Sequence, residues 1–196
     1  MLIDFVTLNN VFDDPDSLVE FAKRQKFMTM HEHPNASDGK TYFDGVRSLP
    51  IDLLDKNLFH RSIEEIFTKV LKNRFLNDEG KIKYTFGYTA TSYFHIMKQK
   101  DQFQEMWKHT DPNAIMAGLV YLNKNPKPDS GTTIYTHGGE KLKVPNEYNK
   151  LVLYSSSMPH HPDGGFGEDA EDGRLTLVFF VEEFRVRFEL DQPKPQ

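Results

Sequence analysis

The sequence predicts an α+β protein in which N-terminal helices pack on one sheet of a β-sandwich or jelly roll. Helical periodicity is confined to the first 80 residues, and the chain after Gly80 consists of short β-rich runs separated by turn residues. A chain of 196 residues suits one well-buried core and is short for two domains. We therefore expect a single domain spanning residues 1–196, with helical support in 1–80 and a jelly-roll core in 81–190.

The helical part begins after an opening strand, LIDFVTLN, at residues 2–9. Asp14 and Pro15 then start a helix, with Asp14 as its N-cap and Pro15 at its first position. A second helix is predicted over roughly 59–76, where apolar residues recur at helical spacing. These residues are Ile63, Ile66, Phe67, Val70, Leu71 and Phe75.

The β-rich part contains five runs of β-branched and aromatic residues that predict strands. They are KIKYTFGYTATSYFHIM at 81–97, IMAGLVYLN at 115–123, TTIYT at 132–136, KLVLYS at 150–155 and RLTLVFFVEEFRVRFEL at 174–190. Short strands with turn residues between them are typical of antiparallel sandwiches and jelly rolls.

The composition argues against several classes of function. The net charge is -5 and no run of five basic residues occurs, which argues against binding to nucleic acid or to an anionic membrane. The chain has no cysteine, so any metal must be held by His, Asp or Glu. The longest apolar stretch, 175–181, is too short to span a membrane, and the N-terminus lacks the basic start of a secretory signal. We expect a cytoplasmic protein.

Candidate metal ligands come from a His-x-Asp pattern that occurs twice, as His109-Thr-Asp111 and as His161-Pro-Asp163. On an extended segment, residues i and i+2 share a face, so such a pair can present an imidazole and a carboxylate to one metal ion. The second pair runs directly into Gly164-Gly165, which indicates a turn, and no histidine follows it. The first pair is therefore the better candidate.

A third ligand and a cation follow in the sequence. His160 lies 51 residues beyond His109 (160 minus 109), near the end of a predicted strand, where a jelly roll can return it to the first pair. Arg174 opens an apolar strand, an unusual place for a permanent cation unless it meets an anion. Two His and one carboxylate are typical of non-haem Fe(II) oxygenases. Because neighbouring strand residues face opposite sides, only one of His160 and His161 can bind the metal well.

Five elements in a fixed order extend over about residues 84–184. They are His109-Thr-Asp111, Val120-Tyr-Leu-Asn123, Ser130-Gly-Thr-Thr133, Leu153-Tyr-Ser-Ser156 with His160, and Arg174-Leu-Thr176. This order resembles the 2-oxoglutarate/Fe(II)-dependent oxygenases, specifically the prolyl-hydroxylase-like branch with phage and bacterial members. Two departures are Ser155, where the family usually has Pro, and the doubled histidine; the family spacing favours His160.

The resemblance implies a double-stranded β-helix, the jelly roll of this family, with Fe(II) bound by His109, Asp111 and His160. It implies that Arg174 binds the distal carboxylate of the co-substrate 2-oxoglutarate, with Thr176 and Tyr121 as neighbouring hydroxyl donors, and that O2 takes the remaining position on iron. The implied activity is hydroxylation of a primary substrate such as a prolyl or other amino-acid side chain of a protein.

Two other functions stay open at this point. One is a jelly-roll binding or structural module without catalytic turnover, and the other is a cupin-type metal dioxygenase that does not use 2-oxoglutarate. Arg174 distinguishes the latter, because a side chain that points away from the metal would remove the co-substrate site. Arg174 could also form an ordinary ion pair with a nearby carboxylate such as Asp172. Arg47, in a Gly-Val-Arg-Ser segment, could be structural or substrate-binding.

Overall fold

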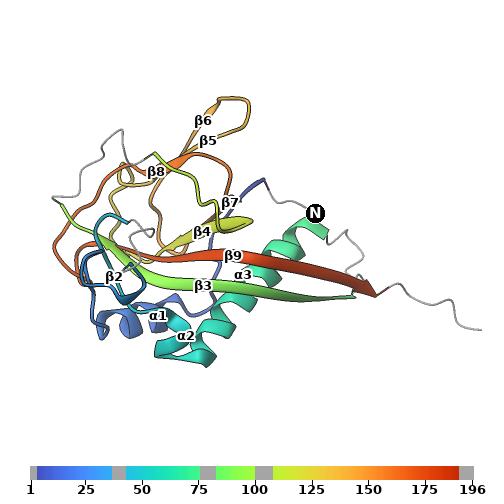
Figure 1. The fold of residues 1–196 in the computed structure, drawn as a ribbon, viewed down its shortest axis with the longest axis horizontal. Helices are drawn as coiled ribbons and strands as arrows, with labels where there is room; N and C mark the ends of the chain where they lie inside the picture. Colours follow the sequence, from blue (N-terminus) through green and yellow to red (C-terminus); the bar gives the residue numbers. More distant parts are fainter. Residues whose placement is uncertain (1–3, 37–42, 76–82, 100–107, 190–196) are drawn as a thin grey trace, which may run out of the picture.

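The computed structural model describes residues 4–36, 43–75, 83–99 and 108–189 (Figure 1). The elements in chain order are β1 (Phe5–Leu8), α1 (Pro15–Lys23), the short 3-10 helix η1 (Pro34–Ala36), β2 (Val46–Arg47), α2 (Ile51–Leu54), α3 (Lys56–Phe75), β3 (Lys83–Met97), β4 (Met116–Tyr121), β5 (Thr132–Tyr135), β6 (Lys141–Val144), β7 (Leu151–Ser155), β8 (His160–Pro162) and β9 (Arg174–Glu189). None of the described helices is long and apolar enough to cross a membrane.

Two antiparallel sheets make up the β-structure. The larger has the strand order β1-β7-β4-β9-β3-β2, and the smaller has the order β6-β5-β8. In Figure 1 the helices lie on one side of the long strands β3 and β9, and the smaller sheet lies on the other side. The predicted antiparallel β-sandwich is confirmed at this level.

The first helix begins where the sequence predicts it to begin. The Asp14 side chain accepts a hydrogen bond from the Ser17 backbone N–H at 3.1 Å, and Pro15 occupies the first turn. Helix α3 starts at Lys56, earlier than predicted, because the Asp55 carboxylate accepts a bond from the Leu58 N–H at 2.9 Å and so caps an additional turn.

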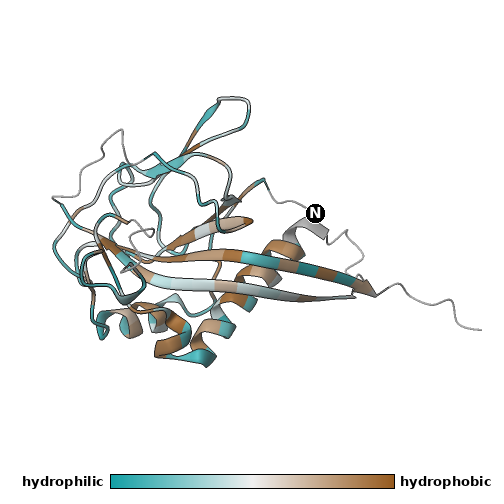
Figure 2. Cartoon of the chain, in the orientation of Figure 1, coloured by the Kyte–Doolittle hydropathy of each residue, from teal (hydrophilic) through white to brown (hydrophobic). Residues whose placement is uncertain are grey.

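Strand β9 shows how the two faces of the larger sheet differ. Alternate residues point to opposite faces of a strand. Leu175, Leu177, Phe179 and Val181 belong to one hydrophobic cluster, which includes residues of α1 and α3, while Val178 belongs to a second cluster, which includes residues of β5 and β6. Figure 2 shows most of the first half of β9 in brown, with an unbroken apolar run at 177–181, and the second half alternating between teal and brown. The first half is buried on both faces as a result.

Ring contacts tie the first cluster together. The ring centroids of Phe67 in α3 and Phe179 in β9 are 6.4 Å apart, and those of Phe21 in α1 and Phe94 in β3 are 6.1 Å apart. The opposite face of the sheet meets the smaller sheet through Tyr121, Ile134 and Val152. This second interior, between the two sheets, is where the candidate ligands converge.

The shortest elements were not predicted from the sequence, and β8 is the most important of them for the site. The sequence indicated a turn at Gly164-Gly165 but no strand before it, whereas His160, His161 and Pro162 pair with Ile134, Thr133 and Thr132 of β5. A three-residue strand that ends in Pro carries no periodic pattern, and its partner strand supplies the order.

Candidate metal centre

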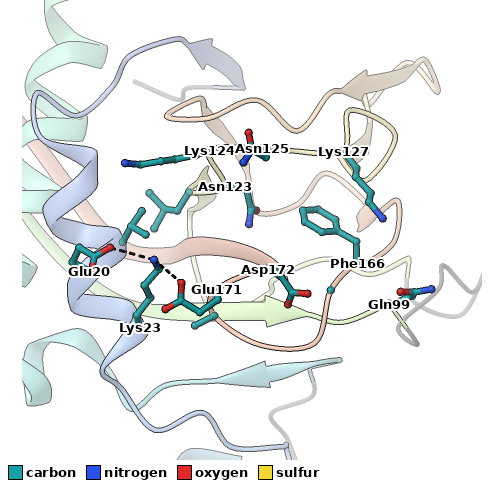
Figure 3. A pocket seen from close by; sticks show the side chains of 14 residues that line it. Glu20, Lys23, Gln99, Asn123, Lys124, Asn125, Lys127, Phe166, Glu171 and Asp172 are labelled. Atoms are coloured by element: carbon teal, nitrogen blue, oxygen red, sulfur yellow. Dashed lines mark hydrogen bonds and ion pairs between the residues drawn. The ribbon is translucent and has the colours of Figure 1, made fainter.

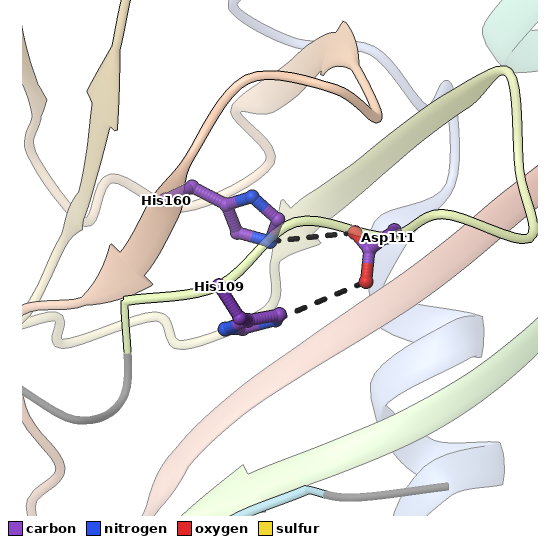
Figure 4. Close-up of side chains that lie close together, drawn as sticks. All are labelled: His109, Asp111 and His160. Atoms are coloured by element: carbon purple, nitrogen blue, oxygen red, sulfur yellow. Dashed lines mark ion pairs between the residues drawn. The ribbon is translucent and has the colours of Figure 1, made fainter. Parts of the chain in front are cut away.

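His109, Asp111 and His160 come together at one end of the space between the sheets (Figure 4). His109 and Asp111 lie just before β4, and His160 opens β8. One ligand atom from each residue lies within 4.8 Å of the others. His160 Nε2 is 3.4 Å from Asp111 Oδ2, and His109 Nε2 is 3.8 Å from Asp111 Oδ1. Ligands at right angles on a metal 2.0–2.2 Å away lie about 3 Å apart, close to this spacing.

Main-chain hydrogen bonds fix this arrangement. The His109 N–H donates to the His160 carbonyl at 3.1 Å, and the His160 N–H donates to the His109 carbonyl at 2.9 Å. The Asp111 N–H donates to the Ser156 carbonyl at 2.9 Å. The segment before β4 therefore pairs with β8, and its i, i+2 spacing turns His109 and Asp111 toward the same side.

The electrostatics of the pair between His160 and Asp111 favour a bound cation. Burial, assisted by His109, lowers the pKa of His160 to about 3, so its imidazole is neutral. His160 Nδ1 lies 3.0 Å from the Met158 carbonyl, which assigns the proton to Nδ1 and leaves the Nε2 lone pair directed at Asp111. The 3.4 Å distance between His160 and Asp111 is therefore not an ion pair, because His160 is not protonated at Nε2.

The Asp111 carboxylate also lacks a partner in this pair. Its Oδ2 atom is buried and has no hydrogen-bond partner among the described residues. Burial raises the pKa of Asp111, while His109 and Arg47 act in the opposite direction. Two acceptor atoms thus face each other, and only a metal ion or a shared proton can lie favourably between them. The residues present fit a divalent metal ion.

A cavity of about 80 Å³ adjoins the three residues, and Arg174 lies on it. The lining residues are Arg47, His95, Met97, His109, Gly118, Leu119, Thr132, Tyr154, His160, Pro162, Arg174, Val178 and Phe180. Asp111 is not among them, so the cavity reaches the candidate metal position from the histidine side.

Arg174 is a buried cation, with only 2% of its surface exposed. Its Nε donates to the Ser130 carbonyl at 2.6 Å, and its Nη2 donates to the Gly131 carbonyl at 3.0 Å and to Thr132 Oγ1 at 3.2 Å. Burial lowers its pKa. Within the described ranges no carboxylate forms an ion pair with Arg174, so the ion-pair interpretation does not hold. Neutral carbonyls orient the guanidinium but leave its charge to be matched by an anion.

Tyr121 and Thr176 neighbour this cation without lining the cavity. The Tyr121 hydroxyl donates to Thr132 Oγ1 at 2.8 Å, and Thr132 also accepts the bond from Arg174. The Thr176 hydroxyl donates to the His95 carbonyl at 3.4 Å. The Arg174 guanidinium carbon also lies 5.4 Å from the Tyr121 ring centroid, so Tyr121 acts on Arg174 both directly and through Thr132. A contact of either hydroxyl with a co-substrate stays a prediction.

The two adjacent histidines face opposite ways, as the strand geometry requires. His161 Nε2 lies 3.2 Å from the Tyr135 hydroxyl in β5, and His161 Nδ1 lies 3.7 Å from Asp163 Oδ1. His160, and not His161, lies beside Asp111.

Three further residues lie on the cavity: Arg47, His95 and Tyr154. The sequence left Arg47 open as structural or substrate-binding, and it did not identify His95 or Tyr154 as site residues. The Tyr154 ring lies 4.5 Å from the His160 ring, and burial raises the pKa of Tyr154 well above its usual value. His95 Nε2 lies 2.6 Å from the Asp44 carbonyl. The alternation of residues in β3 and β7 predicts which side chains share a face. Only the packing of the two sheets shows that a cavity lies on that face.

A larger groove, of about 510 Å³, lies elsewhere, between α1 and the loops that precede β5 and β9 (Figure 3). Two of the three lysines that line it form ion pairs. Lys23 bonds to Glu20 and Glu171, and Lys124 bonds to Asp16. No histidine is among its described lining residues, so the smaller cavity is the better candidate for metal chemistry.

Comparison with known proteins agrees with this fold. No protein-family model matches the sequence, and no curated protein is significantly similar to it. Among solved structures, a Pseudomonas putida prolyl-4-hydroxylase superposes with a TM-score of 0.60 at 15% identity, covering 91% of this chain and 92% of that one. A Trichoplax adhaerens prolyl hydroxylase, solved with a hypoxia inducible factor peptide fragment, superposes with a TM-score of 0.51 at 15% identity. The match covers 90% of this chain and 82% of that one.

A third similar structure is HygX from Streptomyces hygroscopicus, solved with nickel, 2-oxoglutarate and hygromycin B. It gives a TM-score of 0.50 at 8% identity over 90% of this chain and 82% of that chain. The three similarities define the class: this chain has the fold of the prolyl-hydroxylase-like 2-oxoglutarate/Fe(II) oxygenases.

Proposed function

We propose that this protein is an Fe(II)- and 2-oxoglutarate-dependent oxygenase that hydroxylates a prolyl or other amino-acid side chain. The observation that carries the proposal is the buried, unpartnered carboxylate oxygen of Asp111, 3.4 Å from a neutral His160 imidazole. The fold shared with known oxygenases supports it.

In this proposal His109, Asp111 and His160 hold the iron. Two imidazoles and one carboxylate leave coordination positions for a co-substrate and for O2. When bound, the iron would supply the redox chemistry that converts the primary substrate, O2 and 2-oxoglutarate to the hydroxylated substrate, succinate and CO2. The protein contributes the ligand set and a neutral His160, which is ready to bind without losing a proton.

Arg174 binds the distal carboxylate of 2-oxoglutarate in this proposal. Its bonds to Ser130, Gly131 and Thr132 fix the guanidinium before the ligand arrives, which lowers the entropy lost on binding. Tyr121 and Thr176 are proposed as additional hydroxyl groups near that carboxylate. The helical segment 1–80 is proposed as the support that holds β3 and β9 in place.

An anaerobic titration with Fe(II) and 2-oxoglutarate tests the proposal, because joint binding produces a weak visible charge-transfer band. His160→Ala should remove the band, while the adjacent His161→Ala serves as the matched control and should retain it. Arg174→Lys keeps a cation but loses the fork geometry, and we expect it to bind 2-oxoglutarate about tenfold more weakly or worse.

The alternatives predict different results. Folded wild-type protein that binds Fe(II) but not 2-oxoglutarate would be a cupin-type metal dioxygenase. Folded wild-type protein that binds neither would be a jelly-roll binding or structural module. Either result would overturn the proposed function.

A further inference from the structure

A second buried guanidinium lies on the same cavity as the candidate metal ligands. Arg47 belongs to β2, at the edge of the larger sheet, and its side chain crosses the face of β3 and β9. The guanidinium carbon lies 4.5 Å from the ring centroid of Phe43, 5.5 Å from that of Tyr93 and 5.6 Å from that of Phe180. These three rings form an aromatic cage around the cation.

The cage leaves part of the guanidinium without a polar partner. Arg47 Nε is buried, and its N–H donates no hydrogen bond to any described residue. Burial lowers the pKa of Arg47 to about 10, partly offset by Tyr93 and Asp111. No ion pair joins Arg47 to a carboxylate in the described parts of the chain. Aromatic faces stabilise a cation less than a paired carboxylate does, and they accept no strong hydrogen bond. The Arg47 Nε–H is therefore left without an acceptor among the described residues.

The charges around the cavity indicate that a further anionic group can bind there. In the proposed function Asp111 is taken up by a divalent metal ion, and 2-oxoglutarate brings two negative charges. Against these stand the metal ion and the two cations Arg47 and Arg174. Counting these groups alone, one positive charge is left over. None of the described residues that line the cavity is acidic, and Asp44 and Asp163, whose charges act on Arg47 and Arg174, lie outside that lining. A further anionic group would neutralise the site.

Resting on the proposed function, we propose that Arg47 binds a carboxylate of the primary substrate, so that the substrate is a carboxylic acid oxidised close to its carboxylate. A guanidinium suits a planar carboxylate because both can form two parallel hydrogen bonds. The rings of Phe43, Tyr93 and Phe180 exclude water from these bonds and offer an apolar wall to the carbon next to the carboxylate.

The arginine Nε–Hε signals in an NMR spectrum of the full chain test this inference directly. The protein is first saturated with Zn(II), which binds without turnover, and with 2-oxoglutarate. Acetate is then added as the probe, with sodium chloride at the same ionic strength and acetamide as controls. Arg24 is the matched reference, since its guanidinium lies 5.9 Å from the Phe21 ring centroid but is exposed to solvent.

We expect acetate to shift the Arg47 signal in a saturable manner and to leave the Arg24 signal in place, with no response to acetamide or chloride. Arg47→Gln should weaken acetate binding by about tenfold or more, the size of a lost charged hydrogen bond. The same variant should keep its affinity for Zn(II) and for 2-oxoglutarate.

Three results would overturn the inference. An Arg47 signal that ignores acetate, or moves no more than Arg24, would show that the cage takes no carboxylate. A signal that moves with 2-oxoglutarate alone, and not with acetate afterwards, would assign Arg47 to the co-substrate. A Zn(II) affinity that falls tenfold in Arg47→Gln would make Arg47 a positioning residue for Asp111.

The failure of the proposed function looks different. It would appear as Zn(II) and 2-oxoglutarate leaving the His160 and Arg174 signals unchanged. An acetate response of Arg47 in that case would show a carboxylate site on a protein that is not this oxygenase.

Discussion

His160 Nε2 lies 3.4 Å from Oδ2 of Asp111, a carboxylate oxygen with no hydrogen-bond partner among the described residues. The free energy of unfolding of the metal-free protein is lowered by this arrangement, since a buried polar atom without a partner is unfavourable. Binding of a metal ion removes the cost. The site is therefore organised for a ligand at the expense of stability without one.

Asp111→Asn follows from this relationship. The amide can donate to His160 Nε2, so we expect the metal-free variant to be more stable than wild type by about 1 kcal/mol. The same variant should lose about 100-fold or more in Zn(II) affinity, because a neutral amide replaces an anionic ligand. Urea denaturation with and without Zn(II) measures both effects. A variant that is less stable than wild type without metal would contradict the expectation.

Tyr121→Phe tests the network that orients Arg174. Removing the hydroxyl deletes the bond to Thr132 Oγ1 and frees Thr132 from a position that also serves Arg174. We expect 2-oxoglutarate affinity to fall about three- to tenfold, with Zn(II) affinity unchanged. Tyr135→Phe is the control, because its hydroxyl faces His161. Calorimetric titration decides the matter, and equal losses in both variants would exclude a specific role for Tyr121.

His95 should make the metal-free protein less stable in acid. Burial, followed by the charge of Arg47, lowers its pKa well below 6.5 in the folded state. The unfolded chain therefore takes up the proton first, so this stability is present above about pH 6.5 and is lost as the pH falls, by up to about 1.4 kcal/mol per pH unit. His95→Gln should reduce the slope of unfolding free energy between pH 7 and 5, and the exposed His137→Gln should not. Identical slopes in wild type, His95→Gln and His137→Gln would show that His95 does not contribute to the loss of stability in acid.

Two glycines of the larger sheet should respond differently to alanine. A Cβ at Gly118 would lie 2.5 Å from Phe179 Cζ and 2.8 Å from the Val152 carbonyl oxygen, whereas a Cβ at Gly87 meets nothing within 4 Å. We expect Gly118→Ala to lower the free energy of unfolding by about 2–3 kcal/mol and Gly87→Ala to change it by less than about 1 kcal/mol. Thermal unfolding of the two variants, both in strands, compares them; similar losses would refute the packing argument.

Local sequence signals predicted the elements that carry them. The Asp14-Pro15 pair marks the start of α1, and the alternation of β9 gives its two faces, because each effect acts within a few residues. Strand β8 was missed, since three residues hold no periodicity and β5 decides their conformation. The same strand explains the histidines: the sequence shows that His160 and His161 face apart, but the pairing with β5 decides which one turns toward Asp111.

Arg47 could not be placed from the sequence. Its cage is built from Phe43, Tyr93 and Phe180, which come from three segments that adjoin only after β2, β3 and β9 have paired. Asp111 is a comparable case, because a His-x-Asp pattern shows that two side chains share a face but not that one carboxylate oxygen is buried without a donor. Both features depend on long-range packing.

The pairing of His109 with His160 has a consequence for folding. The two residues lie 51 positions apart (160 minus 109), and four strands, β4, β5, β6 and β7, lie between them. A metal ion held by both would close this loop as a covalent bridge does, and would confine the unfolded chain in the same way. A chain without cysteine would thereby possess a removable cross-link, set by the metal supply and independent of the redox state of its surroundings.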